Sequence, residues 1–206
     1  MTTRIYLIRH GATSANGEIP YRLQGRGSNR SLDDLGRDQA RRARLALAHI
    51  PLVAIYSSPL NRAIETASII AKPHTLIPIT VENLTEANVG RWEGLTWEQA
   101  ERQDRELHDR FHANPGTVAY PDGESFADVA NRVTPALASL AVAHHGGSIA
   151  VVAHNVVNRA VLAELLGLPI DKARALRQAN GGINVIEYEG SSARVVTLNA
   201  IFHLES

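Results

Sequence analysis

The chain has 206 residues, with 21 Lys or Arg and 21 Asp or Glu, so its formal net charge is zero. This balance argues against nucleic acid or an anionic membrane as the main partner, and the length suits one well-buried domain, which we expect to span residues 1–206. Cysteine is absent, which excludes disulfides, thiolate metal ligands and a cysteine nucleophile.

The first predicted element is a strand over residues 5–8, followed directly by Arg9, His10 and Gly11. Its apolar residues do not alternate with polar ones, which is typical of a parallel strand buried on both faces. Ligand sites in open α/β sheets follow the carboxyl ends of such strands. The sequence therefore predicts a guanidinium and an imidazole in one crevice, with Gly11 allowing close backbone approach. The alternative is a surface loop that merely contains Arg and His.

The next segment, residues 12–31, is rich in turn-forming residues and is predicted to be a long loop, a type of connection that is usually functional. A helix is predicted from Leu35 to Ile50. Arg37, Arg41 and Arg44 form a stripe opposite its apolar face. We interpret the stripe as a solvated helix face rather than a nucleic-acid patch, because the total charge is neutral.

A second apolar run, Val53–Tyr56, ends in Ser57-Ser58-Pro59. Serine before proline favours a helix start, and the predicted helix, Pro59–Ala71, carries Arg62 in its first turn. The helix dipole disfavours a cation at this end of the helix, unless a bound anion compensates both the positive end of the dipole and the guanidinium of Arg62. A third β-like run, Leu76–Val81, contains a proline that suits a sheet edge.

The segment Leu84–Gly94 is irregular and contains two carboxylates, Glu86 and Glu93. Thr96 with Gln99 forms a capping-box pattern, which predicts a polar helix running to about Ala113. A turn over residues 121–125 precedes another helix, predicted from Ser125 to about His144 and capped by Ser125 with Asp128.

Histidines occur at the ends of the next two predicted elements. His144 and His145 follow the helix that starts at Ser125, and we prefer a helix C-terminus over a metal site for this pair. The buried strand Ser148–Ala153 ends on His154, and a helix is predicted over 156–166. Two final strands, 183–188 and 194–199, are predicted to form a hairpin.

Three predicted strands thus end in reactive or anion-binding side chains: Arg9 with His10, Ser57-Ser58 with Arg62, and His154. If one sheet edge collects them, forked guanidinium donors suit a phosphate group. Neighbouring arginines would keep an imidazole unprotonated, and a neutral imidazole is a competent nucleophile.

The motifs also resemble a known family. Arg9-His10-Gly11, Ser57–Ala67, Leu84–Gly94, Pro121–Ser125 and Val151–His154 are similar to those of the histidine phosphatase superfamily, the phosphoglycerate mutase-like proteins. The resemblance covers nearly the whole chain. It implies an α/β fold with three layers, in which helices flank a mostly parallel central sheet.

The resemblance implies roles for individual residues. His10 would be phosphorylated during turnover, Glu86 would be the acid, and Arg9, Arg62 and His154 would bind the phosphoryl group. The candidates for phosphate or substrate binding also include Asn16, Arg22, Gln24, Gly25 and Asn155. Glu93 competes with Glu86 for the role of the acid, and we prefer a loop-anchoring role for it.

The implied reaction needs no metal and no cofactor. His10 would attack phosphorus in line while Glu86 protonates the leaving oxygen, and water activated by the same carboxylate would hydrolyse the phosphohistidine. Two arginines and a protonated His154 would stabilise the charge on the phosphoryl oxygens.

Two other functions stay open. The main alternative within the same superfamily is a phosphoglycerate mutase-type phosphotransferase. The chain is short between Trp97 and Val129, where mutases tend to carry a larger insertion, which favours a phosphatase. A non-catalytic module that senses a phosphorylated ligand is the other. A metal-dependent phosphatase is disfavoured because the sequence has no Asp-x-Asp and no His-x-x-x-His pattern.

We expect a cytoplasmic enzyme whose partner is a small phosphorylated metabolite, with no signal peptide, membrane span or nucleic acid. The sequence leaves a homodimer open. It departs from the family pattern at Ala12, Arg26 and Asn155, all expected near the pocket mouth, so the substrate is not specified. Asn155 is also a candidate N-cap for the helix that follows it.

Overall fold

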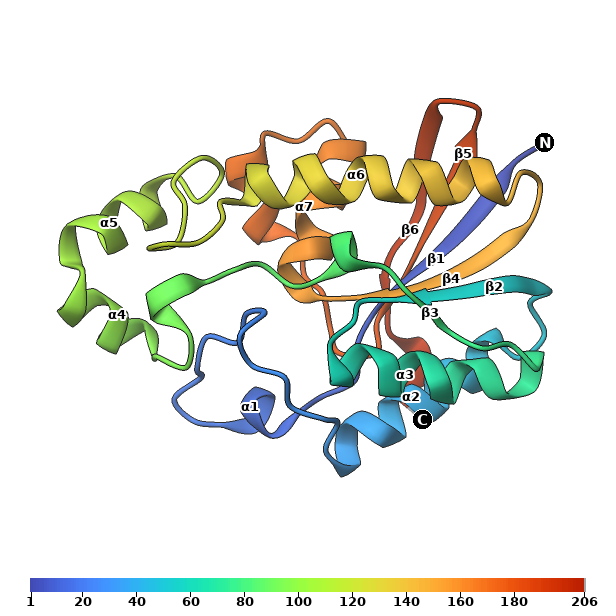
Figure 1. Ribbon diagram of the computed structural model, residues 1–206, viewed down its shortest axis with the longest axis horizontal. Helices are drawn as coiled ribbons and strands as arrows, with labels where there is room; N and C mark the ends of the chain where they lie inside the picture. Colours follow the sequence, from blue (N-terminus) through green and yellow to red (C-terminus); the bar gives the residue numbers. More distant parts are fainter. Residues whose placement is uncertain (206) are drawn as a thin grey trace.

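The structure, a computed structural model, describes residues 1–205. Four strands run parallel: β1 (Thr3–Arg9), β2 (Leu52–Ser57), β3 (Ile79–Thr80) and β4 (Ser148–Ala153). An antiparallel hairpin of β5 (Ile183–Glu189) and β6 (Ser192–Ala200) extends the sheet beside β1. The strand order is β3-β2-β4-β1-β5-β6, which confirms the predicted α/β class with a mostly parallel sheet (Figure 1).

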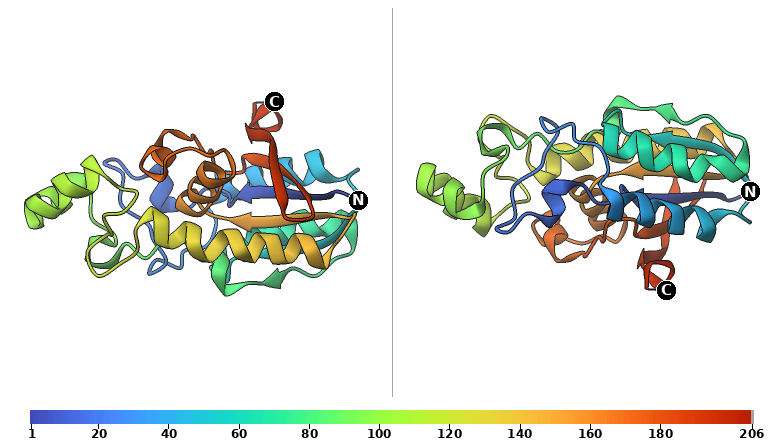
Figure 2. Two further views of the ribbon diagram at one scale, coloured as in Figure 1. Left: turned by 90° about the horizontal axis from the view of Figure 1, so that it is seen from above. Right: turned by 90° about the horizontal axis from the view of Figure 1, so that it is seen from below.

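Two pairs of helices cover the sheet, α2 (Asp34–Leu47) with α3 (Asn61–Ala71) on one face and α6 (Phe126–Ala143) with α7 (Asn155–Leu165) on the other (Figure 2). Successive side chains of a strand point to opposite faces. In β1, Ile5 and Leu7 therefore pack with α6 and α7, whereas Tyr6 and Ile8 pack with α2 and α3. Both faces of β1 are buried, as its unbroken apolar run predicted.

The remaining helices are short. They are α1 (Ser14–Gly17), α4 (Trp97–Gln103), α5 (Arg105–Ala113) and the 3-10 helices η1 (Lys72–His74), η2 (Glu82–Leu84), η3 (Gly90–Trp92), η4 (Ile170–Ala175) and η5 (Phe202–Leu204). The α4–α5 pair lies at the end of the molecule opposite the N-terminus, beyond the carboxyl ends of β1, β2 and β4 (Figures 1 and 2). These helices therefore stand over the sheet edge at which the sequence predicts a site.

Several predicted boundaries are wrong because tertiary contacts decide them. The helix predicted over 96–113 is interrupted at Asp104, whose φ of −138° is not helical. Its carboxylate accepts the indole N–H of buried Trp92 at 2.9 Å, a contact between distant segments. Likewise α3 starts at Asn61 with Leu60 as its N-cap, not with the serine-proline pair. The hydroxyl of Ser58 instead accepts the Leu60 N–H at 3.3 Å.

Other elements differ in length from the prediction. The third β-like run contributes only the two residues of β3, and α2 ends at Leu47, three residues before the predicted Ile50. The loop over residues 12–31 contains the single helical turn α1. No helix within residues 1–205 has the length and apolar character required to cross a membrane.

The predicted caps at two helix starts are confirmed. Thr96 and Gln99 form the reciprocal capping box of α4, and Ser125 and Asp128 form that of α6. His144 is the C-cap of α6, as predicted, and its Nε2 atom lies 2.8 Å from the Tyr56 hydroxyl.

Candidate active site

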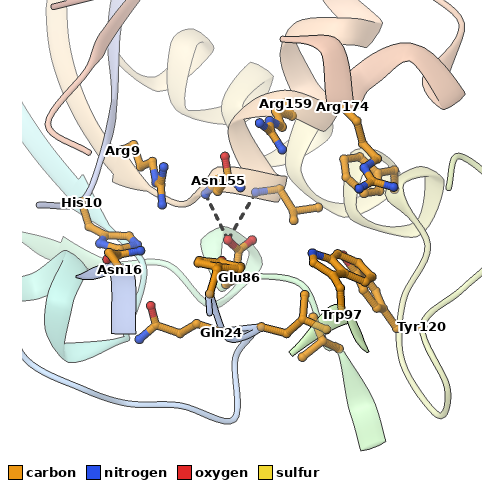
Figure 3. Close-up of a pocket in the computed structure, with 15 residues that line it drawn as sticks. Arg9, His10, Asn16, Gln24, Glu86, Trp97, Tyr120, Asn155, Arg159 and Arg174 are labelled. Atoms are coloured by element: carbon orange, nitrogen blue, oxygen red, sulfur yellow. Dashed lines mark hydrogen bonds between the residues drawn. The ribbon is translucent and has the colours of Figure 1, made fainter. Parts of the chain in front are cut away.

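A cavity of about 150 Å³ opens at the carboxyl edge of the sheet, under α4. Side chains from β1, the 12–31 loop, the segment of Glu86, α4 and α7 converge on it (Figure 3). We call this cavity the active-site pocket. Of the residues predicted for the site it contains six: Arg9, His10, Asn16, Gln24, Glu86 and Asn155.

His10 follows β1 directly and is 3% exposed. Its Nδ1 atom lies 2.6 Å from the Gly11 carbonyl, which can only accept, so Nδ1 carries the proton and Nε2 carries the lone pair. Burial, followed by the charges of Arg62 and Arg9, lowers the pKa of His10 well below its usual value. The imidazole is therefore neutral at pH 7, as a nucleophile requires.

The backbone around His10 is fixed by close contacts. The Gly11 N–H donates to Thr66 at 3.1 Å, and the Asn180 side chain donates to the His10 carbonyl at 3.0 Å. Gly36 of α2 packs against the turn after His10 so closely that a Cβ atom on Gly36 would lie 1.9 Å from the Ala12 carbonyl oxygen. The close backbone approach predicted at Gly11 is made by α2, since a Cβ on Gly11 would meet the Gly36 carbonyl at 2.3 Å.

Two buried guanidinium groups flank His10. Arg62 is 0% exposed; its Nε–H donates to His10 Nε2 at 3.2 Å, and its terminal nitrogens donate to the carbonyls of Ser28 at 2.5 Å and Gly25 at 3.1 Å. Arg9 donates to the Gln178 carbonyl at 2.6 Å, and its buried Nε atom has no hydrogen-bond partner. Burial lowers the pKa of Arg9 to about 10, so both arginines carry a charge at pH 7.

His154, at the end of β4, lies beside His10 with the ring centroids 5.1 Å apart. Its Nε2 atom lies 2.7 Å from the Ser58 hydroxyl. Burial, then Arg62 and His10, lowers the pKa of His154 well below its usual value. Burial and the guanidinium groups around His154 thus disfavour a proton on it in the unliganded protein, whereas the protonated His154 that we expect belongs to the complex with a phosphoryl group.

Arg62 and His154 do not line the pocket itself. Both are 0% exposed and lie behind the imidazole of His10, which they contact directly. Arg62 contacts His10 at its Nε2 atom. A group that bonded to this atom would therefore come within range of the Arg62 N–H.

Glu86 is anchored at the start of α7. Its carboxylate accepts the backbone N–H groups of Asn155 at 3.0 Å, Val156 at 3.3 Å and Val157 at 3.4 Å, where the helix dipole favours negative charge (Figure 3). Asn155 is the first residue of α7 and not its N-cap, which is His154. The capping that we considered for the Asn155 side chain is done by the carboxylate of Glu86.

A second carboxylate holds the Glu86 segment in place. Glu124 accepts two N–H groups of Arg132 at 2.7 and 3.1 Å and the Asn88 backbone N–H at 2.8 Å. Arg132 also donates to the carbonyls of Asn83 at 2.6 Å and Glu86 at 3.4 Å. The motif over residues 121–125 thus ties α6 to the segment that carries Glu86.

Glu93 has a different role. Its two carboxylate oxygens accept the backbone N–H groups of Gly25 at 2.8 Å and Gly27 at 3.1 Å. It does not line the active-site pocket. This geometry agrees with the loop-anchoring role that we preferred for Glu93.

Only some of the residues predicted to bind phosphate or substrate line the pocket. Asn16 and Gln24 line the pocket, although Asn16 also caps α1 by accepting the Thr13 N–H at 2.9 Å. Gly25 lies outside it and is held by Glu93 and Arg62. Arg22 also lies outside, where its guanidinium pairs with Glu18 at 3.1 Å and donates to the Gly94 carbonyl at 2.9 Å.

Six further pocket residues with polar or aromatic side chains were not predicted: Tyr21, Trp97, Tyr120, Phe126, Arg159 and Arg174. One of them was detectable, because Arg159 lies in the first turn of the helix predicted over 156–166, four residues after the candidate site residue Asn155. The others come from a loop, a helix start and η4, whose positions no local period reveals. Within residues 1–205, no group of three or more His, Asp or Glu side chains is placed to hold a metal ion.

Comparison with known proteins gives consistent matches. The family model of the histidine phosphatase superfamily (branch 1) matches residues 5–201. The bifunctional protein Rv2228c of Mycobacterium tuberculosis is 37% identical over 153 residues, which are 74% of this chain and 41% of that protein. This chain therefore spans less than half the length of that relative.

Two further matches cover the chain almost completely. The metal-independent phosphoserine phosphatase of Arabidopsis thaliana is 32% identical over 209 residues, covering 99% of this chain and 84% of that protein. The solved structure of Bacillus stearothermophilus YhfR has a TM-score of 0.90 and 33% identity, covering 98% of this chain and 100% of that chain.

Proposed function

Because this chain belongs to the histidine phosphatase superfamily (branch 1), we propose that it is a phosphoric monoester hydrolase in which His10 accepts the phosphoryl group of a small metabolite. The observation that carries the proposal is the pair formed by His10 and Arg62. A neutral imidazole presents Nε2 next to a buried guanidinium N–H 3.2 Å away, at the edge of a pocket. The nucleophilic nitrogen of His10 is thus in direct contact with a guanidinium group that can bind an anion.

The substrate phosphate would enter beside Nε2 and take over the Arg62 N–H, because a phosphate dianion is a stronger acceptor than a neutral imidazole. This exchange frees the lone pair of His10 for attack. On the other side Arg9 supplies its unpartnered Nε–H. The dianion also offsets the charge of the two arginines, which favours a protonated His154 in the complex although it is neutral in the free protein.

In the first step Nε2 of His10 bonds to phosphorus as the bond between phosphorus and the ester oxygen breaks. The phosphate dianion beside Glu86 favours the protonated form of this carboxyl group, so Glu86, on the same pocket, takes up a proton on substrate binding, gives it to the leaving oxygen and becomes a carboxylate. Arg9 and Arg62 stabilise the negative charge of the equatorial oxygens, and as preformed groups they need little reorganisation. The products are an alcohol and phosphorylated His10.

In the second step water replaces the alcohol. Glu86 takes one proton from the water as its oxygen bonds to phosphorus, and the phosphorus–nitrogen bond breaks. Inorganic phosphate, a neutral His10 and a protonated Glu86 result, which restores the starting state. None of these steps is assigned to a metal ion, and the name of the Arabidopsis relative supports a metal-independent reaction.

The experiment is a turnover assay with a panel of phosphorylated metabolites: sugar phosphates, phosphoglycerates, phosphoserine and nucleotides. We expect inorganic phosphate to appear in step with the dephosphorylated alcohol. Phosphorus NMR of the phosphoglycerate reaction separates the alternative, because a mutase would give the isomeric phosphoglycerate without free phosphate. Binding of several panel members without any turnover would contradict the proposal and favour a phospho-ligand sensor.

A further inference from the structure

The wall of the pocket away from His10 carries two arginines. Arg159 lies one helical turn after Asn155 on α7, and Arg174 lies on η4. Both point towards the pocket from the side opposite His10, with Glu86 between (Figure 3). The reaction proposed above assigns no role to either side chain.

Neither arginine has an acidic partner among residues 1–205. Arg159 donates through Nε to the Leu176 carbonyl at 2.7 Å, and Arg174 has a contact of 3.3 Å between Nη1 and His112 Nδ1. The carboxylate on this pocket, Glu86, makes no ion pair with them and accepts backbone N–H groups instead. Burial and then the charge of Arg174 lower the pKa of Arg159, whereas the charge of Glu86 raises it without forming an ion pair. The two cations therefore repel each other, and neither has an anion in direct contact within the described part of the chain.

Arg174 is also held in a defined position. Its guanidinium carbon lies 5.4 Å from the centre of the Trp97 ring and 5.9 Å from that of Phe111. Cation–π contacts of this length are favourable and restrict a flexible side chain. A forked donor fixed in this way, next to a second one, is arranged to bind the planar oxygens of an anion.

We propose that Arg159 and Arg174 form a second anion subsite, so that the preferred substrates are small phosphomonoesters with a carboxylate or another anionic group at the end away from the scissile phosphate. The inference rests on the proposed function only in placing the scissile phosphate at His10. An anion at the far wall would offset two half-buried like charges and use guanidinium N–H groups that have no anionic partner in the free protein.

The subsite is tested by binding, which does not need turnover. The probes are 3-phosphoglycerate and glycerol 3-phosphate, because the two differ in carrying a carboxylate or a hydroxymethyl group at the far end. Isothermal titration uses the full chain with His10→Ala, which prevents hydrolysis. We expect 3-phosphoglycerate to bind about 10- to 100-fold more tightly, as one or two charge-assisted hydrogen bonds would give.

The second substitution assigns the preference to the subsite. Adding Arg174→Gln should weaken binding of 3-phosphoglycerate to the affinity of glycerol 3-phosphate and leave glycerol 3-phosphate unchanged. Arg174→Lys, which keeps the charge without the fork, should retain part of the preference. Arg177→Gln is the matched control, because Arg177 lies in the same segment but is exposed and outside the pocket; it should change neither affinity.

A bisphosphate probe distinguishes a carboxylate from a second phosphate as the anionic group that the subsite prefers. A bisphosphate that binds more tightly than 3-phosphoglycerate, and loses this advantage with Arg174→Gln, identifies the second group as phosphate. Equal affinity for the two three-carbon probes and the bisphosphate would overturn the subsite, as would a preference for an anionic end that survives both Arg174→Gln and Arg159→Gln. Inhibition constants measured on the wild-type protein against p-nitrophenyl phosphate give the same ratios if the His10 variant is unstable. An absence of turnover in wild type would contradict only the proposed function.

Discussion

The carboxylate of Glu86 accepts the backbone N–H of Asn155 at 3.0 Å, so the proposed acid is attached to the first turn of the helix that follows His154. Glu93, only seven residues later in the chain, instead binds the backbone of Gly25 at 2.8 Å, outside the pocket. The two carboxylates should therefore have separable effects on activity.

Glu86→Gln should slow the phosphorylation step for an alkyl phosphate by roughly two to four orders of magnitude, because the amide cannot protonate a poor leaving group. An activated aryl phosphate should suffer far less, since its phenoxide departs without a proton. Single-turnover or burst kinetics are required, because Glu86 is also assigned to activate water in the second step.

Glu93→Gln is the control for this comparison. It should weaken the loop around Gly25 and lower activity towards both ester classes alike. A leaving-group-dependent defect in Glu93→Gln, with none in Glu86→Gln, would assign the acid to Glu93 and leave the role of His10 intact.

Chelation and vanadate give the second prediction. EDTA should leave turnover unchanged, because the steps proposed use only protein side chains. Vanadate should inhibit competitively, since it adopts the five-coordinate geometry of the phosphoryl group under attack. Activity that disappears with EDTA and returns with an added divalent metal would contradict this reaction scheme.

The third prediction concerns stability and pH. Burial and neighbouring arginines lower the pKa of His10 and His154 in the folded protein, whereas the unfolded chain binds protons near pH 6.5. Below about pH 6.5 the unfolded state therefore binds more protons than the folded state. For each pH unit by which the pH is lowered in this range, the free energy of unfolding should fall by up to about 1.4 kcal/mol per histidine. Above that pH the contribution of these two groups is constant.

Urea unfolding between pH 7.5 and 5 measures this slope. His10→Gln should make the curve shallower, whereas His145→Gln, at an exposed position beyond α6, should leave the slope as in wild type. Identical slopes for wild type and both variants would mean that burial of His10 is not linked to proton uptake on unfolding.

The fourth prediction tests the contact that fixes the turn after His10. A Cβ atom on Gly36 would lie 1.9 Å from the Ala12 carbonyl oxygen, and backbone cannot move aside as a flexible side chain would. Gly36→Ala should therefore destabilise the protein by at least about 1–3 kcal/mol. Gly17→Ala, where a Cβ meets nothing within 4 Å, is the control and should be close to neutral in urea unfolding.

The sequence was most informative where local pattern and function coincide. The unbroken apolar runs of β1 and β4 predicted buried parallel strands, and the residues after them, His10 and His154, do come together, with ring centroids 5.1 Å apart. Buried parallel strands leave little freedom about where their carboxyl ends lie. The capping boxes of α4 and α6 were predictable for the same reason, since each is formed by residues three positions apart.

The features that the sequence did not reveal depend on distant partners. The break at Asp104 depends on the indole N–H of Trp92. The lowered pKa of His154 in the free protein depends on burial and then on Arg62 and His10. Nothing in the 174 region identifies Arg174 as a pocket residue before η4 is placed beside α4 and α5. Such contacts have no period along the chain, so pattern analysis does not detect them.

The central claim is that His10 carries the phosphoryl group. Its most direct test is rapid acid-free quenching of wild-type protein with substrate labelled in its phosphate, followed by mapping of the labelled peptide. We expect a phosphoenzyme that is acid-labile and base-stable, labelled at His10, and formed fast enough to precede phosphate release. His10→Ala should give no labelled protein and essentially no turnover. Phosphate release by His10→Ala at a rate near that of wild type would contradict the account.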